Sequence, residues 1–133
     1  MEFALSEEQG ILSESIKKMF DENIGIDNLR DHSKGEKSLR KTIRRSIIDM
    51  GLPGLMIPEE YGGSGLGVLE ASLVAEQIGS YAVPSPWIGN SIMAPTAILF
   101  EKDNHLAEKW LPLIASGEIT ACISLSEVIG KRG

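Results

Sequence analysis

Apolar side chains recur three or four residues apart along much of the chain, which is the spacing of one face of an α-helix. This pattern predicts helices over about residues 6–23, 36–50, 68–78, 90–100 and 104–117. Ser6 opens the first of them with a capping-box sequence, and Gly51 and Gly117 stand where two others should end. Pro95 falls inside the fourth and is expected to kink it, while the polar stretch 27–35 predicts a turn or one loose helical turn. We therefore expect an all-α fold, an orthogonal or up-down bundle of about five to six helices.

The end of the chain follows a different pattern. Apolar residues alternate there with small polar ones, a period of two that is typical of a β-strand. The apolar members are Ile119, Ala121, Ile123 and Leu125. A lone strand leaves its backbone groups unpaired, so we expect it to begin a second, β-rich domain. The sequence is accordingly divided into a helical domain over residues 1–117 and a first strand with a loose tail over 118–133.

Two stretches stand out as candidates for binding. The glycine-rich stretch 62–67 lacks both the Gly-Lys-Ser/Thr ending of a phosphate loop and the spacing of a dinucleotide fingerprint, so we interpret it as a structural turn. Basic residues gather only on the helix predicted over 36–50, where an acidic partner and a solvated face are both possible; we favour the solvated face. These residues are Lys37, Arg40, Lys41, Arg44 and Arg45.

Composition narrows the function further. The 133 residues carry a net charge of -6, which is a poor match for nucleic acid, and they contain no apolar run of the roughly 18 residues that a membrane-spanning helix needs. His32, His105 and Cys122 lie in no metal-ligand spacing, so we expect no metal site and interpret Cys122 as structural. The first nine residues show no leader pattern. A small cytoplasmic domain is therefore expected.

Three motifs give the chain a family resemblance. Residues 50–67 read MGLPGLMIPEEYGGSGLG, residues 75–79 read AEQIG, and residues 110–118 read WLPLIASGE. With the strand ending SLSE at 124–127, they resemble the N-terminal part of the acyl-CoA dehydrogenase family over about residues 1–127. Members of that family use FAD to oxidise the Cα–Cβ bond of acyl-CoA thioesters, and an electron-transferring flavoprotein then takes the electrons.

The resemblance implies roles for a few residues of this chain. Leu125 and Ser126 match the strand that touches the flavin. The stretch that lines the acyl end of the family's cavity corresponds here to Val83, Trp87, Ser91 and Ala94. The family's catalytic glutamate has no counterpart in these 133 residues, so the resemblance implies no catalytic residue here and no FAD binding by this chain alone.

Two hypotheses of different class follow. The first is an N-terminal part of an FAD-dependent acyl-CoA dehydrogenase, inactive alone and working within a homo- or hetero-oligomer; residues 128–133 already depart from the family pattern. The second is a stand-alone helical module that kept the family scaffold for protein–protein interaction, because apolar faces that other domains normally cover would then be exposed.

Overall fold

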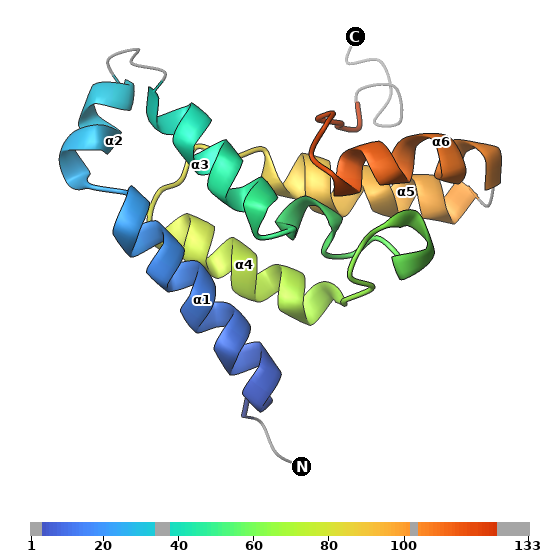
Figure 1. Ribbon diagram of the computed structural model, residues 1–133, viewed down its shortest axis with the longest axis horizontal. Coiled ribbons are helices and arrows are strands. Elements are labelled where there is room, and N and C mark those ends of the chain that lie inside the picture. Colours follow the sequence, from blue (N-terminus) through green and yellow to red (C-terminus); the bar gives the residue numbers. More distant parts are fainter. Residues whose placement is uncertain (1–3, 34–37, 102–103, 125–133) are drawn as a thin grey trace, which may run out of the picture.

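Helices dominate the computed structural model, which describes residues 4–33, 38–101 and 104–124. Within these ranges there are six α-helices, two 3₁₀ turns (η1, η2) and one π-helical segment (η3), and no strand (Figure 1). Their bounds are α1 Glu7–Asn23, α2 Ile26–Ser33, α3 Ser38–Asp49, η1 Leu52–Gly54, η2 Glu59–Tyr61, α4 Val68–Ser80, η3 Ile88–Met93, α5 Ala94–Glu101 and α6 Asn104–Ala115. The all-α fold expected from the sequence is confirmed.

The first turns of α1 and α4 are tied to one another. The Ser6 hydroxyl accepts a hydrogen bond from the Gln9 backbone N–H at 3.2 Å, and the Gln9 side chain accepts one from the Ser6 N–H at 3.0 Å, which is the predicted capping box. The Gln9 amide also donates to Glu70 at 2.8 Å, and Glu70 accepts from the Gly67 N–H at 2.9 Å. One connected set of hydrogen bonds thus provides partners for backbone N–H groups at the starts of both helices.

The far ends of the same two helices also meet. Tyr81, directly after α4, donates its hydroxyl hydrogen to the carboxylate of Asp21 on α1. Its ring lies 5.4 Å, centroid to centroid, from that of Phe20. Contacts at both ends show that α1 and α4 run side by side in the same direction, as Figure 1 shows.

Two clusters of buried side chains form the core. The larger joins α1, α3, α4 and η1 to the linker that follows α4. The smaller surrounds Ile57 and the inner face of α6, with Ile98 and Leu99 of α5 packed against it. In Figure 1, α5 and α6 accordingly lie together on one side of the molecule, away from α1 and α2.

The stretch 27–35 was expected to form a turn or one loose helical turn, but the helix observed there is longer than that. Residues Ile26–Ser33 form a two-turn helix, α2. Asp27 lies in its first turn, where the helix dipole favours a negative charge, and Leu29 packs on the larger core. Packing of this partly buried side chain on the core favours a helix in an otherwise polar segment.

The glycine-rich loop is closed on itself. Every backbone N–H from Gly62 to Gly67 donates to an oxygen of the chain. Gly63 is wedged so tightly that an added Cβ would lie 2.0 Å from the Ile57 carbonyl oxygen and 2.6 Å from that of Gly54. The loop therefore offers no free N–H to a phosphate and acts as the structural turn predicted.

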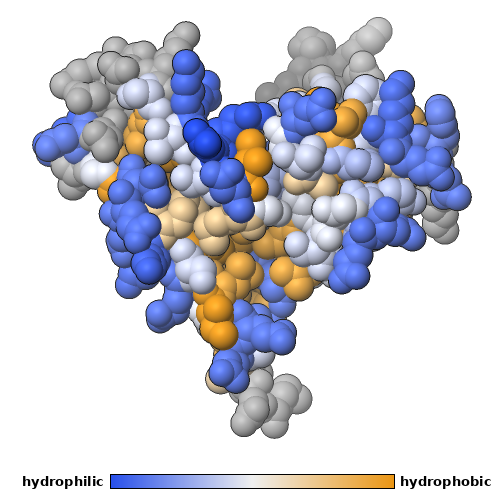
Figure 2. Space-filling model, in the orientation of Figure 1, coloured by the Kyte–Doolittle hydropathy of each residue, from blue (hydrophilic) through white to orange (hydrophobic). Residues whose placement is uncertain are grey.

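Large apolar side chains are exposed where α1 and α4 begin. Leu66, Val68 and Leu69, which we call the α4 patch, are 41%, 69% and 53% exposed, and Leu5 and Ile11 are exposed at the start of α1. Figure 2 shows apolar surface gathered at the lower centre of this face, over the first halves of the two helices.

The C-terminal segment is described only as far as Ser124. Residues 120–124 form no regular secondary structure, and the rest of the predicted strand lies outside the described residues. The strand and the division at residue 117 therefore stay predictions. Across the described ranges, every helix is too short or too polar to cross a bilayer.

Candidate functional site

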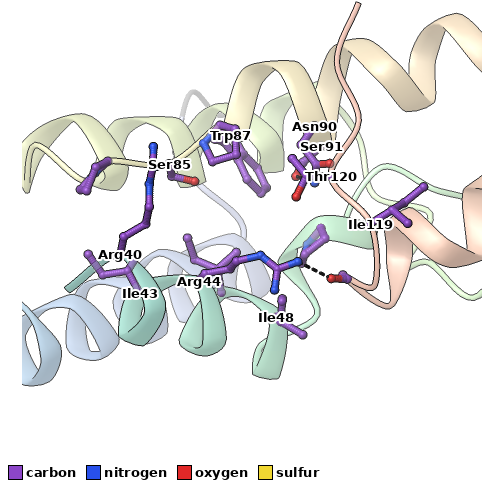
Figure 3. Close-up of a pocket in the computed structure, with 15 residues that line it drawn as sticks. Arg40, Ile43, Arg44, Ile48, Ser85, Trp87, Asn90, Ser91, Ile119 and Thr120 are labelled. Atoms are coloured by element: carbon purple, nitrogen blue, oxygen red, sulfur yellow. Dashed lines mark hydrogen bonds between the residues drawn. The ribbon is translucent and has the colours of Figure 1, made fainter. Parts of the chain in front are cut away.

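A hollow of about 550 Å³ opens between α3, the linker after α4, the start of η3 and the segment after α6 (Figure 3). We call it the α3 hollow. Its lining residues are Arg40, Ile43, Arg44, Ile47, Ile48, Pro53, Pro84, Ser85, Pro86, Trp87, Asn90, Ser91, Gly117, Ile119 and Thr120. They come from separate stretches of sequence, so folding alone brings them together.

The floor of the α3 hollow is apolar and buried. Ile43 and Ile47 of α3 are buried one turn apart, and Trp87 is only 2% exposed. The Trp87 indole N–H donates to the Ala71 carbonyl oxygen at 3.4 Å, which fixes the ring against α4. Trp87 thus belongs both to the larger core and to the wall of the hollow.

A polar corner closes one end of the hollow. Asn90 and Ser91 are both buried, and the Asn90 side-chain oxygen accepts a hydrogen bond from the Ala121 N–H at 2.8 Å. The Asn90 amide nitrogen lies 3.5 Å from the Ser91 hydroxyl. This corner ties the segment after α6 to η3.

Both of these neighbours lie in the π-helical segment η3, whose wide turn follows from Pro95. Pro95 was expected to kink a helix over 90–100; the chain instead forms Ile88–Met93 as a π-helix and places Pro95 in the first turn of α5. A proline ring crowds the carbonyl four residues before it and has no N–H to give it. A wider turn relieves that crowding, and the Ala94 N–H accordingly donates to the Gly89 oxygen five residues back.

Positive charge lines the mouth of the hollow. Arg40 and Arg44 lie one helical turn apart on α3, and Arg44 Nη2 donates to the Gly117 carbonyl oxygen at 2.7 Å. Figure 3 shows the Arg40 side chain rising from α3 toward Ser85 on the opposite wall. Within the described residues Arg40 forms no hydrogen bond or ion pair, and no acidic residue is among those that line the hollow.

The basic cluster is therefore divided between two faces of α3. Lys41 and Arg45 are exposed, with Arg45 Nε 3.8 Å from the Asp49 carboxylate. Arg40 and Arg44 are exposed as well, but unlike Lys41 and Arg45 they also line the hollow, and Lys37 lies outside the described residues. The spacing of four residues between Arg40 and Arg44, shared with Ile43 and Ile47, was the available signal in the sequence.

The residues expected near an acyl group fall in three places. Trp87 and Ser91 line the α3 hollow. Val83 is buried in the larger core and lines neither hollow. Ala94 lines a smaller, almost wholly apolar hollow of about 250 Å³ beside Trp110. The structure thus brings two of the four together.

The expected flavin residues, Leu125 and Ser126, lie outside the described residues, and their contact with a flavin stays a prediction. Cys122, interpreted as structural, is exposed at the rim of the smaller hollow. Within the described residues no three His, Cys, Asp or Glu side chains are grouped as metal ligands would be.

Comparison with known proteins places this fold in a family. The sequence model for the N-terminal domain of acyl-CoA dehydrogenases matches residues 6–118. The chain belongs to the acyl-CoA dehydrogenase family. The resemblance read from the three motifs is thereby confirmed, and all lining residues of the α3 hollow except Ile119 and Thr120 lie within the matched range.

Individual relatives agree with this assignment. The chain is 33% identical over 126 residues to the mitochondrial isovaleryl-CoA dehydrogenase of Pongo abelii, covering 92% of this chain and 30% of that protein. It is 37% identical over 84 residues to the acyl-CoA dehydrogenase FadE12 of Mycobacterium tuberculosis, covering 59% of this chain and 20% of that enzyme. It therefore spans less than a third of the length of these relatives.

A solved structure shares the fold. The crystal structure of the ChsE4–ChsE5 complex from Mycobacterium tuberculosis superposes with a TM-score of 0.85 at 25% identity, over all of this chain and 36% of that one. The arrangement of helices described above is thus also found in a chain of that complex.

Proposed function

We propose that these residues form the N-terminal helical domain of an FAD-dependent acyl-CoA dehydrogenase and supply one wall of its acyl cavity. The observation that carries the proposal is the family match over residues 6–118, together with the α3 hollow that Trp87 and Ser91 line. The hollow is apolar, has a polar corner and has a volume typical of small-molecule sites. Within this proposal, residues 118–133 begin the next, β-rich domain.

The domain positions the acyl group and does not carry out the chemistry. When bound, FAD in this family accepts a hydride from the substrate, and a carboxylate removes the proton from the neighbouring carbon. A general base must reach the proton that it abstracts. None of the described residues that line the two hollows is a carboxylate, so none of them serves as this base. We propose that the 133-residue polypeptide alone neither holds FAD nor turns over acyl-CoA.

Partners follow from the same proposal. Acyl-CoA is the substrate of the whole enzyme and an electron-transferring flavoprotein its electron acceptor. The structural neighbour is a complex of two named chains, which supports assembly of this domain into a homo- or hetero-oligomer. A cytoplasmic location is part of the proposal, and cell fractionation would test it.

The proposal is tested by exchanging domains. Residues 6–118 replace the corresponding part of an active relative such as isovaleryl-CoA dehydrogenase, and flavin absorbance and acyl-CoA turnover are measured. We expect the chimera to keep its flavin and to oxidise some acyl-CoA. Ser91→Phe, which fills the α3 hollow, should raise KM, whereas Ser72→Phe on the exposed side of α4 should not. A folded chimera with full flavin and no turnover of any acyl-CoA would contradict the proposal, as would turnover by the 133-residue chain alone.

A stand-alone interaction module is the second candidate, and the exposed α4 patch is the observation that favours it. Isolated apolar patches of this kind mark interaction sites. A discrete oligomer of the 133-residue chain that dissociates on Val68→Lys, in a genome where no reading frame downstream resumes the family pattern, would support this function over the first.

A further inference from the structure

We propose that the α3 hollow binds a hydrocarbon chain that ends in a carboxylate, with the carboxylate paired to Arg40 at the mouth. The inference deepens the proposed function, on which it rests, because it gives the acyl group a chemical class: one with a carboxylate at the end away from the thioester. The charges, burial and shape of the hollow all point to this class of ligand.

The inside of the hollow selects a hydrocarbon. Ile43, Ile47 and Trp87 form its floor and are nearly devoid of solvent contact, and Pro53 is buried beside them. A hydrocarbon that lies against this floor removes its own apolar surface from water, at about 25 cal/mol per Å². A compact polar ligand such as free phosphate would instead lose its hydration against this floor without replacement hydrogen bonds.

The mouth selects an anion. The whole chain carries a net charge of -6, yet the hollow is lined by two arginines and by no acidic residue among those described. A guanidinium has five N–H donors, and Arg44 donates one of them to the Gly117 carbonyl oxygen. Arg40 forms no ion pair or hydrogen bond in the described part of the chain, which leaves its charge available at this mouth.

The geometry around Arg40 suits a carboxylate. Its side chain reaches toward Ser85, which lies on the facing wall together with the proline-rich linker (Figure 3). A planar guanidinium binds a carboxylate through two parallel hydrogen bonds, and the Ser85 hydroxyl is a further donor at the same rim. The hydrocarbon then lies across the apolar floor between Ile43 and Trp87.

The test measures binding to the 133-residue chain, with no flavin and no turnover. Trp110→Phe removes the tryptophan that is outside the α3 hollow, so that Trp87 in the wall becomes the sole indole reporter. Decanoate, decan-1-ol and decyl phosphate are titrated in turn while Trp87 fluorescence is followed. We expect saturable binding of decanoate, at least about tenfold tighter than decan-1-ol and weakened by salt, since a charge-assisted hydrogen bond is lost in the alcohol.

Two substitutions on the same helix separate the pocket from general charge. Arg40→Gln should weaken decanoate binding about tenfold and leave decan-1-ol binding unchanged, and Arg40→Lys should restore part of the loss. Arg45→Gln removes the same charge from the face of α3 that is outside the hollow and should change neither affinity. Thermal unfolding of each variant verifies that the fold is intact.

Several outcomes would overturn the inference. These are an absence of saturable decanoate binding, equal weakening by Arg40→Gln and Arg45→Gln, or equal affinity for decanoate and decan-1-ol. Tighter binding of decyl phosphate than of decanoate would assign the mouth to a phosphate rather than to a carboxylate. Failure of the proposed function is recognised separately, because it appears as an inactive chimera whatever the fatty-acid affinity of this chain.

Discussion

The glycine-rich loop and helix α3 differ in whether their polar groups already have hydrogen-bond or ion-pair partners within the chain. In the loop, every N–H from Gly62 to Gly67 is already bonded within the chain. On α3, Arg40 has no partner in the described residues and faces a hollow. The stretch with the more conspicuous sequence is thus a structural element, and the plainer helix carries the binding surface. A motif predicts a site only where folding leaves its donors or charges free.

The largest expected effect comes from Gly63→Ala in the loop. The new Cβ would lie 2.0 Å from one backbone oxygen and 2.6 Å from another, and neither is free to move alone. We expect a loss of about 3 kcal/mol or more in the free energy of unfolding, measured by urea denaturation. Gly10→Ala is the matched control, because nothing lies within 4 Å of its Cβ, and it should stabilise α1 by about 0.5–1 kcal/mol. Equal effects of the two would contradict this account of the loop.

The polar corner of the α3 hollow should give a smaller and more local effect. Asn90→Ala removes the acceptor of the Ala121 N–H, at a cost of about 1–2 kcal/mol. Amide hydrogen exchange should accelerate at Ala121 and stay unchanged at Gly65, whose N–H bonds to the Ile57 oxygen inside the loop. Faster exchange at both positions would mean that the two regions open together.

Lowering the pH should destabilise the fold near the glycine-rich loop through protonation of Glu70. The hydrogen bond from the Gln9 side chain, followed by those from the backbone N–H groups of Glu70 and Gly67, lowers the pKa of this carboxyl below its ordinary 4.5. A lowered pKa stabilises the folded state above 4.5, and this stabilisation is lost as the pH falls toward the folded-state value. Glu70→Gln should therefore flatten the dependence of the unfolding midpoint on pH in this range. Ser72→Ala, at an exposed position of the same helix that carries no charge, should leave the slope as it is.

The smallest effect is expected at Arg40. Because it is exposed and makes no polar contact in the described residues, Arg40→Gln should change the free energy of unfolding by less than about 0.5 kcal/mol. Arg44→Gln should cost more, since Arg44 donates to the Gly117 oxygen. Thermal unfolding of the two variants measures the difference. A large loss of unfolding free energy in Arg40→Gln would show that Arg40 stabilises the fold. It would then no longer differ in this respect from the glycine-rich loop.

Local rules predicted most of the fold. Ser6 caps α1 as its sequence indicates, and Gly51 and Gly117 end helices with positive φ values of 70° and 71°. The loop could be recognised as a turn because it fits no nucleotide motif. Such features depend on a few neighbouring residues, which is the range over which sequence patterns are informative.

The site was less predictable because it depends on distant contacts. Spacing on α3 shows that Arg40 and Ile43 are close, but not that the linker at Ser85 lies opposite. The resemblance placed Ala94 with Trp87, whereas the chain puts them in separate hollows. The π-helical turn that divides them arises around Pro95, for which a kink was the simpler expectation. Long-range packing decided the first two of these outcomes, and the third follows from the local geometry of the proline.

The wide turn of η3 also makes the hollow sensitive to the length of the chain. A π-helical turn is closed by bonds spanning five residues instead of four, so loss of a single codon between Ile88 and Met93 would allow an ordinary helix to form there. Every later side chain would then rotate relative to those before it, although the composition would hardly change. Insertion or deletion of one residue is therefore a genetic step, beside a substitution such as Ser91→Phe, by which a protein of this kind would open or close such a cavity.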